Sequence, residues 1–209
     1  MSAAVTLAPG TGLCHGAAPL PLARGGVLDP VHIAYESRGD EGLPLVFALG
    51  GISAGRHVSR SRDDARPGWW DAFVGPGRAL DTDRFRVVGI DWLGGRGEST
   101  NPVATEDPAR FPAVTTIDQA AALALLLEHF GIERAHAIVG GSYGGMVALA
   151  FAATYPAHVG RVVALGAAHR SHPFATALRA VQRRIVALGL RTGAGADALA
   201  LARSLALTT

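Results

Sequence analysis

The chain of 209 residues contains no lysine, a single cysteine and no repeated segment. All 19 basic residues are arginine, and 17 acidic residues leave a net charge of only +2. Because the arginines are scattered along the chain, they do not form the basic footprint of a nucleic-acid-binding protein. A lone cysteine, Cys14, excludes a disulfide within the chain and a cysteine-rich metal site. No pair of histidines has a metal-ligand spacing with acids nearby, so we expect no bound metal.

Long apolar runs are also lacking. No stretch approaches the roughly 18 apolar residues that a membrane-spanning helix needs, and residues 1–20 lack the charged and apolar parts of a secretion signal. We therefore expect a cytoplasmic protein with no membrane partner. The hydrophobic fraction of 49% excludes a disordered chain and is typical of a globular domain with a sizeable core.

Apolar runs and helical patterns alternate along the chain. Residues 1–19 are expected to form a poorly structured lead-in, and residues 20–28 and 31–37 to form antiparallel strands at a sheet edge. Further strands are expected at residues 44–49, 85–92, 135–140 and 161–166, and helices at residues 116–130, from Tyr143 onward, 174–190 and 196–207. This order predicts an α/β fold with a mainly parallel sheet covered by helices. The adjacent Trp69 and Trp70 are interpreted as core packing rather than as the lining of a channel.

The turn at Ser142 is the strongest functional signal. Residues 140–144 read Gly-Gly-Ser-Tyr-Gly, which matches G-x-S-x-G between an expected strand and an expected helix. Glycine has no Cβ, so it permits the crowded backbone that raises a serine hydroxyl out of such a turn. At the start of a helix, free N–H groups favour negative charge that develops on a reacting oxygen. Ser142 is therefore our candidate nucleophile.

A serine nucleophile also needs N–H donors for the oxyanion and a base that removes its proton. The Tyr143 N–H and the loop after residues 44–49, which opens with Gly50 and Gly51, are the expected donors. Beyond Ser142 the chain offers one acid, Asp197, and the histidines His158, His169 and His172. In this fold class the order is serine, acid, histidine. His158 is expected at the wrong end of the sheet, and no acid lies between Ser142 and His169 or His172, so we interpret these two as loop residues near a pocket mouth.

Four segments, taken together and in order, carry a family resemblance. They are residues 48–51 (ALGG) with His57 and Val58, residues 75–85 (GPGRALDTDRF), residues 93–102 (LGGRGESTNP) and residues 140–146 (GGSYGGM). In this combination the chain resembles the N-terminal part of the homoserine O-acyltransferases. This is the α/β-hydrolase-fold branch that makes O-acetyl- or O-succinylhomoserine for methionine synthesis.

The resemblance implies an incomplete α/β-hydrolase core over residues 1–172, with the last strands missing, and the start of a helical lid over residues 173–209. It implies that Ser142 accepts the acyl group from acyl-CoA, a co-substrate rather than a bound cofactor, and passes it to homoserine. The backbone N–H groups of Leu49 and Tyr143 are the implied oxyanion donors. A homodimer is implied for the full-length protein.

The chain also departs from the family pattern. Members of the family carry their catalytic aspartate and histidine in a C-terminal third, to which nothing in residues 1–209 corresponds. We therefore expect this form to be incomplete and inactive. An esterase of the same fold and a non-catalytic fragment remain as alternative functions.

Substrate choice is open at this stage. Gly50, Gly51 and Arg56 are candidate substrate-binding residues, and Arg56 is a candidate cation for the carboxylate of a succinyl group. These residues do not decide between acetyl and succinyl as the acyl group. They also do not decide between homoserine and serine as the acceptor.

Overall fold

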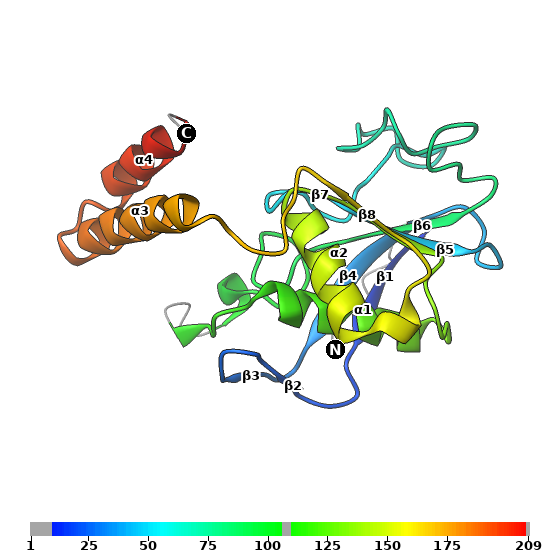
Figure 1. The fold of residues 1–209 in the computed structure, drawn as a ribbon, viewed down its shortest axis with the longest axis horizontal. Helices are drawn as coiled ribbons and strands as arrows, with labels where there is room; N and C mark the ends of the chain where they lie inside the picture. The colour runs from blue at the N-terminus through cyan, green and yellow to red at the C-terminus, as the bar shows by residue number, and fades with distance from the viewer. Residues whose placement is uncertain (1–9, 106–109, 208–209) are drawn as a thin grey trace, which may run out of the picture. The chain divides into compact units, whose positions relative to one another are not determined.

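The computed structural model describes residues 10–105 and 110–207. The chain divides into two compact units, with the boundary between Ala168 and His169. Figure 1 follows the chain through both units, and each unit is described by itself below.

A six-stranded sheet forms the first unit, in the order β1-β4-β6-β5-β7-β8. Its strands are β1 (Thr11–His15), β4 (His32–Arg38), β5 (Leu45–Leu49), β6 (Arg86–Ile90), β7 (Ala137–Gly141) and β8 (Val162–Leu165). β1 and β4 are antiparallel to each other, and β4 is antiparallel to β6. The strands β6, β5, β7 and β8 run parallel, so their carboxyl ends meet at one edge of the sheet. The predicted mainly parallel α/β sheet is confirmed.

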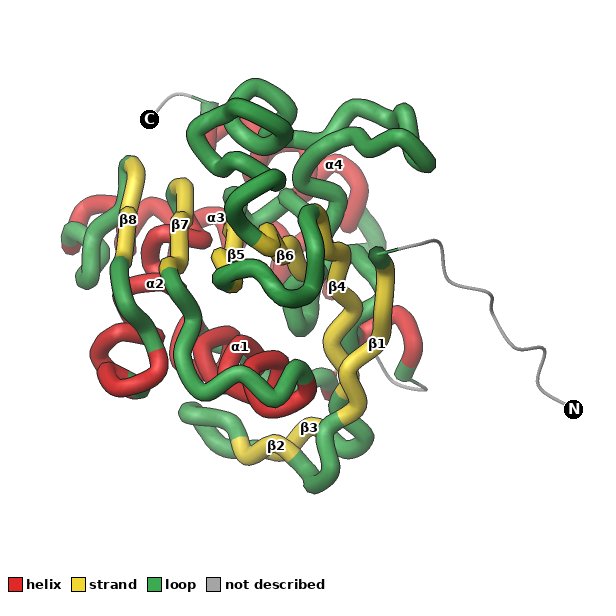
Figure 2. The backbone as a smooth tube through the Cα atoms, turned by 90° about the vertical axis from the view of Figure 1, so that its right-hand side faces the viewer, coloured by secondary structure: helices red, strands yellow, loops and turns green. Residues whose placement is uncertain are grey.

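Alternating side chains give the sheet two buried faces. Phe47 and Leu49 on β5 join the core formed with the helices, whereas Ala48 between them joins the core beneath the segment that links β5 to β6. Figure 2 shows α1 (Thr116–His129) and α2 (Tyr143–Thr154) on the same face of the sheet. A strand covered on both faces is expected to be apolar throughout, as β5 is.

The start of α1 is fixed by a buried carboxylate. Asp118 accepts hydrogen bonds from the Thr115 N–H (2.6 Å) and the Thr115 hydroxyl (2.7 Å), while the Thr115 hydroxyl oxygen accepts the Ile117 N–H. Such reciprocal capping satisfies N–H groups that have no partner within the helix. Asp118 also accepts the Ala23 N–H at 2.7 Å and so ties the early chain to α1.

Two sequence-based expectations near the N-terminus were wrong. Residues 11–15 lie in the expected unstructured lead-in, yet they form β1, because β4 supplies antiparallel partners for the whole segment. The strand expected over residues 20–28 is a small hairpin of β2 (Leu20–Pro21) and β3 (Val27–Leu28), with glycines at positive φ between them. The rest of the expected lead-in, residues 1–9, lies outside the described residues.

The second unit is a pair of helices, α3 (Pro173–Arg191) and α4 (Gly195–Ala206), which pack on each other. Both helices were predicted within two residues of these bounds. Single 3₁₀ turns occur at Pro102–Ala104 (η1) and Pro156–His158 (η3) in the first unit. Within the described ranges, no helix is both long and apolar enough to traverse a membrane.

The cap at Asp118 gives a stability prediction. Asp118→Asn replaces one carboxylate oxygen by an NH₂ group, which must face either the Ala23 N–H or the two Thr115 donors, and it removes the charge. We expect the free energy of unfolding to fall by about 2 kcal/mol. Urea unfolding measures this change. The control is Asp197→Asn, since Asp197 is exposed in the first turn of α4, where we expect less than about 1 kcal/mol. Equal effects at the two positions would contradict the role of Asp118.

Candidate active site

Ser142 occupies a strained turn between β7 and α2. Its backbone has φ 52° and ψ −114°, and it is the only non-glycine residue with positive φ among those the structure describes. Such a conformation costs on the order of 1–3 kcal/mol and persists only where the surrounding structure enforces it. The residue is exposed. The predicted strand–turn–helix geometry is therefore present, with the serine at its apex.

Three backbone hydrogen bonds hold this turn in place. The Ser142 N–H donates to the Leu165 carbonyl at 2.8 Å, and the Ser142 carbonyl accepts the Met146 N–H at 3.1 Å. The Gly144 N–H donates to the Gly50 carbonyl at 2.9 Å. The turn is thus attached to the ends of both neighbouring strands, β5 and β8.

Glycine is required by close contacts within the turn. A Cβ at Gly140 would lie 2.3 Å from backbone atoms of Gly144, and one at Gly144 would lie 2.3 Å from the Leu49 carbonyl oxygen. A Cβ at Gly141 would meet nothing within 4 Å. The close approach of α2 to β5 therefore depends on Gly140 and Gly144.

The predicted oxyanion donors belong to the two elements that come close together here, Leu49 to β5 and Tyr143 to α2. In the described part of the chain, the Tyr143 N–H at the start of α2 has no hydrogen-bond acceptor. Leu49 ends β5 in register with Gly140, one residue before the Gly50 carbonyl that binds Gly144. The partial positive charge of a helix N-terminus adds to the attraction for an anion. The donor roles of Leu49 and Tyr143 remain predictions, and the N–H without an acceptor among the described residues supports that of Tyr143.

The loop after β5 is fixed by groups from the loop after β6. The Gly51 carbonyl accepts the Trp92 indole N–H at 3.0 Å. Asp91 accepts the Arg56 N–H at 2.8 Å and the Arg56 Nη1 at 2.7 Å, and Glu98 binds Arg56 Nη2 at 2.6 Å. Two carboxylates thus balance the charge of Arg56. Its proposed role toward a succinyl carboxylate stays a prediction, as do the substrate-binding roles of Gly50 and Gly51.

Sequence analysis missed Asp91 and Trp92. A usable signal existed, because both follow β6 directly, and ligand sites in parallel sheets lie beyond the carboxyl ends of the strands. Gln119 on α1 was missed as well. It is buried and pairs with both backbone groups of Leu93, accepting the N–H at 3.2 Å and donating to the carbonyl at 2.9 Å. No local sequence pattern identifies that contact.

A cavity of about 200 Å³ opens beside the turn, and Tyr143, Trp92, Ile52 and Gln119 are among the residues that line it. The rings of Trp92 and Tyr143 meet edge to face, with centroids 5.0 Å apart. Burial raises the pKa of the Tyr143 phenol. The group therefore stays neutral at neutral pH, and this cavity wall carries no added charge.

No base is assembled at Ser142 by the first unit. Over residues 10–105 and 110–168, no hydrogen bond joins its hydroxyl to a histidine or a carboxylate. His158 in η3 lies beyond the far end of α2, and its Nδ1 binds the Glu133 carbonyl at 2.7 Å. His172 accepts the Phe174 N–H and so caps α3, and His169 is exposed. His158 thus lies at the end of α2 away from Ser142, as expected, and the contact of His172 and the exposure of His169 fit their interpretation as loop residues.

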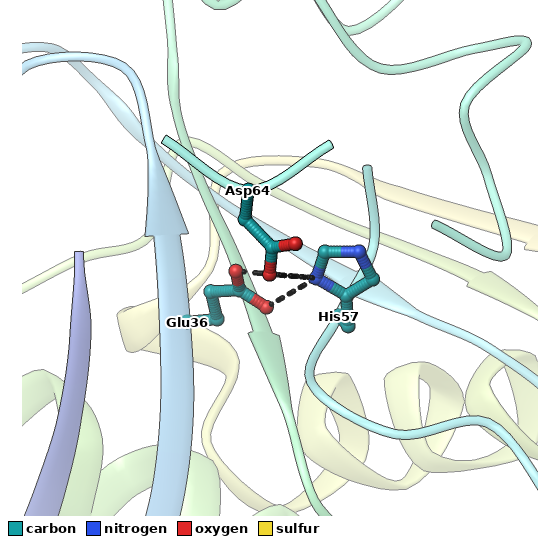
Figure 3. Close-up of side chains that lie close together, drawn as sticks. All are labelled: Glu36, His57 and Asp64. Carbon is teal, nitrogen blue, oxygen red and sulfur yellow. Dashed lines mark hydrogen bonds and ion pairs between the residues drawn. The ribbon is translucent and has the colours of Figure 1, made fainter. Parts of the chain in front are cut away.

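A second polar cluster joins β4 to the loop after β5. His57 Nδ1 lies 3.0 Å from Glu36 Oε2 and 3.7 Å from Asp64 Oδ2, as Figure 3 shows. Among the described residues, this is the only group of three possible metal ligands. Arg38 pairs with Glu36, and the Arg66 guanidinium holds the pKa of Asp64 far below its usual range. Because both carboxylates are already neutralised by arginine, the cluster fits a cross-link better than a metal site.

Comparison with known proteins identifies the family. A family model described as the alpha/beta hydrolase fold matches residues 64–200. A sheet of this order, with a strained serine turn at the carboxyl end of a central strand, is the architecture of that class. The chain belongs to the α/β-hydrolase family.

Curated relatives of the chain have more specific names than the family model. The chain is 43% identical over 188 residues to a homoserine O-succinyltransferase of Xanthomonas campestris, covering 90% of this chain and 48% of that protein. It is 38% identical over 182 residues to a serine O-succinyltransferase of Emericella nidulans, covering 82% and 35%. The chain therefore spans half or less of the length of these curated relatives.

Solved structures resemble the fold. The homoserine O-acetyltransferase of Bacillus anthracis superposes with a TM-score of 0.82 at 24% identity, covering 95% of this chain and 59% of that one. An esterase superposes with a TM-score of 0.81 at 25% identity, covering 93% and 60%. Transferases and esterases thus share this architecture, and fold alone does not choose between them.

The turn glycines yield a matched test. Gly144→Ala would bring a Cβ against the Leu49 carbonyl, so we expect a loss of about 2 kcal/mol in unfolding free energy despite the higher helix propensity of alanine. Gly141→Ala meets open space and should cost less than about 1 kcal/mol. Thermal or urea unfolding of the two variants measures the difference. Equal stability of the two variants would show that α2 does not approach β5 as described.

Proposed function

We propose that the whole protein to which this chain belongs transfers an acyl group from acyl-CoA to the hydroxyl of L-homoserine. One observation carries the proposal. An exposed, strained Ser142 lies beside the Tyr143 N–H, which has no acceptor among the described residues, in a chain 43% identical to a homoserine O-succinyltransferase. Such a site suits attack by a serine oxygen on a thioester carbonyl.

The reaction has two balanced steps. A base removes the Ser142 proton as its oxygen attacks the thioester carbonyl, and the Leu49 and Tyr143 N–H groups stabilise the oxyanion. The carbon–sulfur bond then breaks, and the CoA thiol leaves with the proton, which leaves an acyl ester on Ser142. In the second step the homoserine hydroxyl gives its proton to the base and attacks this ester, which releases O-acylhomoserine and restores Ser142. We assign the base and its carboxylate partner to parts of the protein outside residues 1–209, and we expect residues 1–209 alone to be inactive.

Acyl group and acceptor are the open choices within this proposal. Curated relatives are named for succinyl transfer to homoserine, for succinyl transfer to serine and for acetyl transfer to homoserine. We propose the cytoplasm as its location and a homodimer as its full-length form. The resemblance of the fold to an esterase supports a second candidate, in which water attacks the acyl ester.

Purified whole protein tests the proposal directly. We expect release of CoA from acetyl-CoA or succinyl-CoA to depend on added L-homoserine or L-serine and to yield the O-acyl product by mass spectrometry. Ser142→Ala should lower kcat/KM more than about 1,000-fold. The exposed Ser204 in α4 provides a control, and Ser204→Ala should retain most activity.

Two results would overturn the proposal. If thioester cleavage is equally fast without either amino acid, water is the acceptor and the protein is an esterase. If Ser142→Ala keeps its activity, Ser142 is not the nucleophile.

A further inference from the structure

The loop from Gly50 to Arg56 follows the proposed donor Leu49 and is held from outside by side chains. It has no regular secondary structure, so its backbone groups depend on partners elsewhere in the fold. Besides the bond from the Gly144 N–H to the Gly50 carbonyl, two indole N–H groups donate to this loop. Trp92 Nε1 donates to the Gly51 carbonyl at 3.0 Å, and Trp69 Nε1 donates to the Gly55 carbonyl at 2.9 Å.

Trp92 contacts both halves of the proposed oxyanion site. Its side chain is 4% exposed and follows β6 at the carboxyl edge of the sheet. Its indole N–H binds the β5 loop, and its ring lies edge to face against Tyr143, whose backbone N–H is the second proposed donor. One side chain thereby links the loop that follows Leu49 to the residue that carries the second proposed donor.

Trp69 holds the other end of the same loop. Besides its bond to the Gly55 carbonyl, its ring lies against Gly50, where a Cβ would come within 3.2 Å of two ring atoms. Trp70 is stacked on Trp69 with ring centroids 4.9 Å apart. In the described part of the structure its indole N–H has no acceptor. Trp69 and Trp70 are thus neighbours of the same type, and only Trp69 binds the loop.

These bonds set the directions of peptide planes. The C=O and N–H of one trans peptide point in opposite directions, so a bond to the carbonyl also fixes where the N–H points. The Gly51 carbonyl receives both the Trp92 indole and the Ala54 N–H, at 3.0 and 2.9 Å. The peptide fixed in this way joins Gly51 to Ile52, so the indole acts on the path of the loop that follows Leu49 and not on the Leu49 N–H itself. Without the indole, this peptide would keep only the bond from within its own loop.

We propose that Trp92 and Trp69 are positioning residues of the oxyanion site, which orient the loop after Leu49 through their indole N–H groups. The inference rests on the proposed function, because it assigns these residues to acyl transfer at Ser142. Both indole N–H groups are engaged by loop carbonyls, so we assign them no contact with the reacting atoms. Their contribution is to hold the donors in place before the oxyanion forms, which is when such donors are most effective.

Kinetics of the whole protein test this role. Removal of one direct oxyanion donor typically lowers kcat by 100-fold or more, so a positioning residue should have a smaller effect. We expect Trp92→Phe to lower kcat about 10-fold with KM within about twofold, because the oxyanion exists only in the transition state. Trp69→Phe should act in the same direction. Trp70→Phe is the matched control and should change kcat less than about twofold.

Stability separates positioning from a general loss of structure. Phenylalanine keeps an aromatic ring near Tyr143 but removes the indole N–H and part of the buried ring, so we expect some loss of unfolding free energy. The assay therefore uses a temperature at which unfolding curves show the same folded fraction for Trp92→Phe and the wild type. If kcat of Trp92→Phe equals that of Trp70→Phe, or falls only in proportion to the folded fraction, the proposal is overturned.

Hydrogen exchange of the indoles gives a readout that needs no activity. In ¹H–¹⁵N spectra, each Trp→Phe variant identifies the indole signal that it removes. We expect the Trp92 and Trp69 indole protons to exchange with solvent at least about 10-fold more slowly than that of Trp70. Fast exchange at Trp92, equal to that of Trp70, overturns the inference whether or not acyl transfer is found. If exchange is slow but the wild type transfers no acyl group, the proposed function fails and the positioning role in acyl transfer fails with it.

Discussion

The hydrogen bond from the Gly144 N–H to the Gly50 carbonyl is the contact on which the rest of the site depends. It joins the first turn of α2 to the loop after β5, and it forms only because Gly140 and Gly144 lack a Cβ. Ser142 is held at positive φ within the same few residues. The strain at that serine is therefore balanced by strand pairing and helix packing on both sides of it.

Around this contact, several side chains form hydrogen bonds with backbone groups of the loops. Trp92 and Trp69 donate to loop carbonyls, Asp91 accepts backbone N–H groups, and Gln119 pairs with both polar groups of Leu93. Irregular loops need such partners because buried N–H and C=O groups are costly when unpaired. The loops at the carboxyl edge of the sheet are thereby rigid without having regular secondary structure.

Sequence patterns predicted the parts of the fold whose causes are local. The apolar runs of β5 and β6 and the glycine turn at Ser142 follow from neighbouring residues, and the structure contains each of them. β1 was missed because its residues become a strand only through pairing with β4.

The residues of the candidate site also divide into those that a local pattern identifies and those that it does not. Ser142 and Tyr143 were found from one short motif. The loop contacts of Trp92 and Asp91 could not be predicted, because each joins segments at least 35 residues apart in the chain. Trp69 was correctly placed in a core, where it packs with Val58 and Val74, but its indole bond to Gly55 depends on the path of the loop. A sequence pattern does not contain that path.

The central claim is that the fold forces residue 142 into a conformation that an L-amino acid avoids. Its most direct measurement compares the unfolding free energies of Ser142→Gly and Ser142→Ala in urea. Glycine costs up to about 1 kcal/mol through the flexibility of the unfolded chain, and it removes about 1–3 kcal/mol of backbone strain. The account predicts that Ser142→Gly is the more stable variant by about 1 kcal/mol. A Ser142→Ala protein as stable as the glycine variant, or more stable, would contradict it.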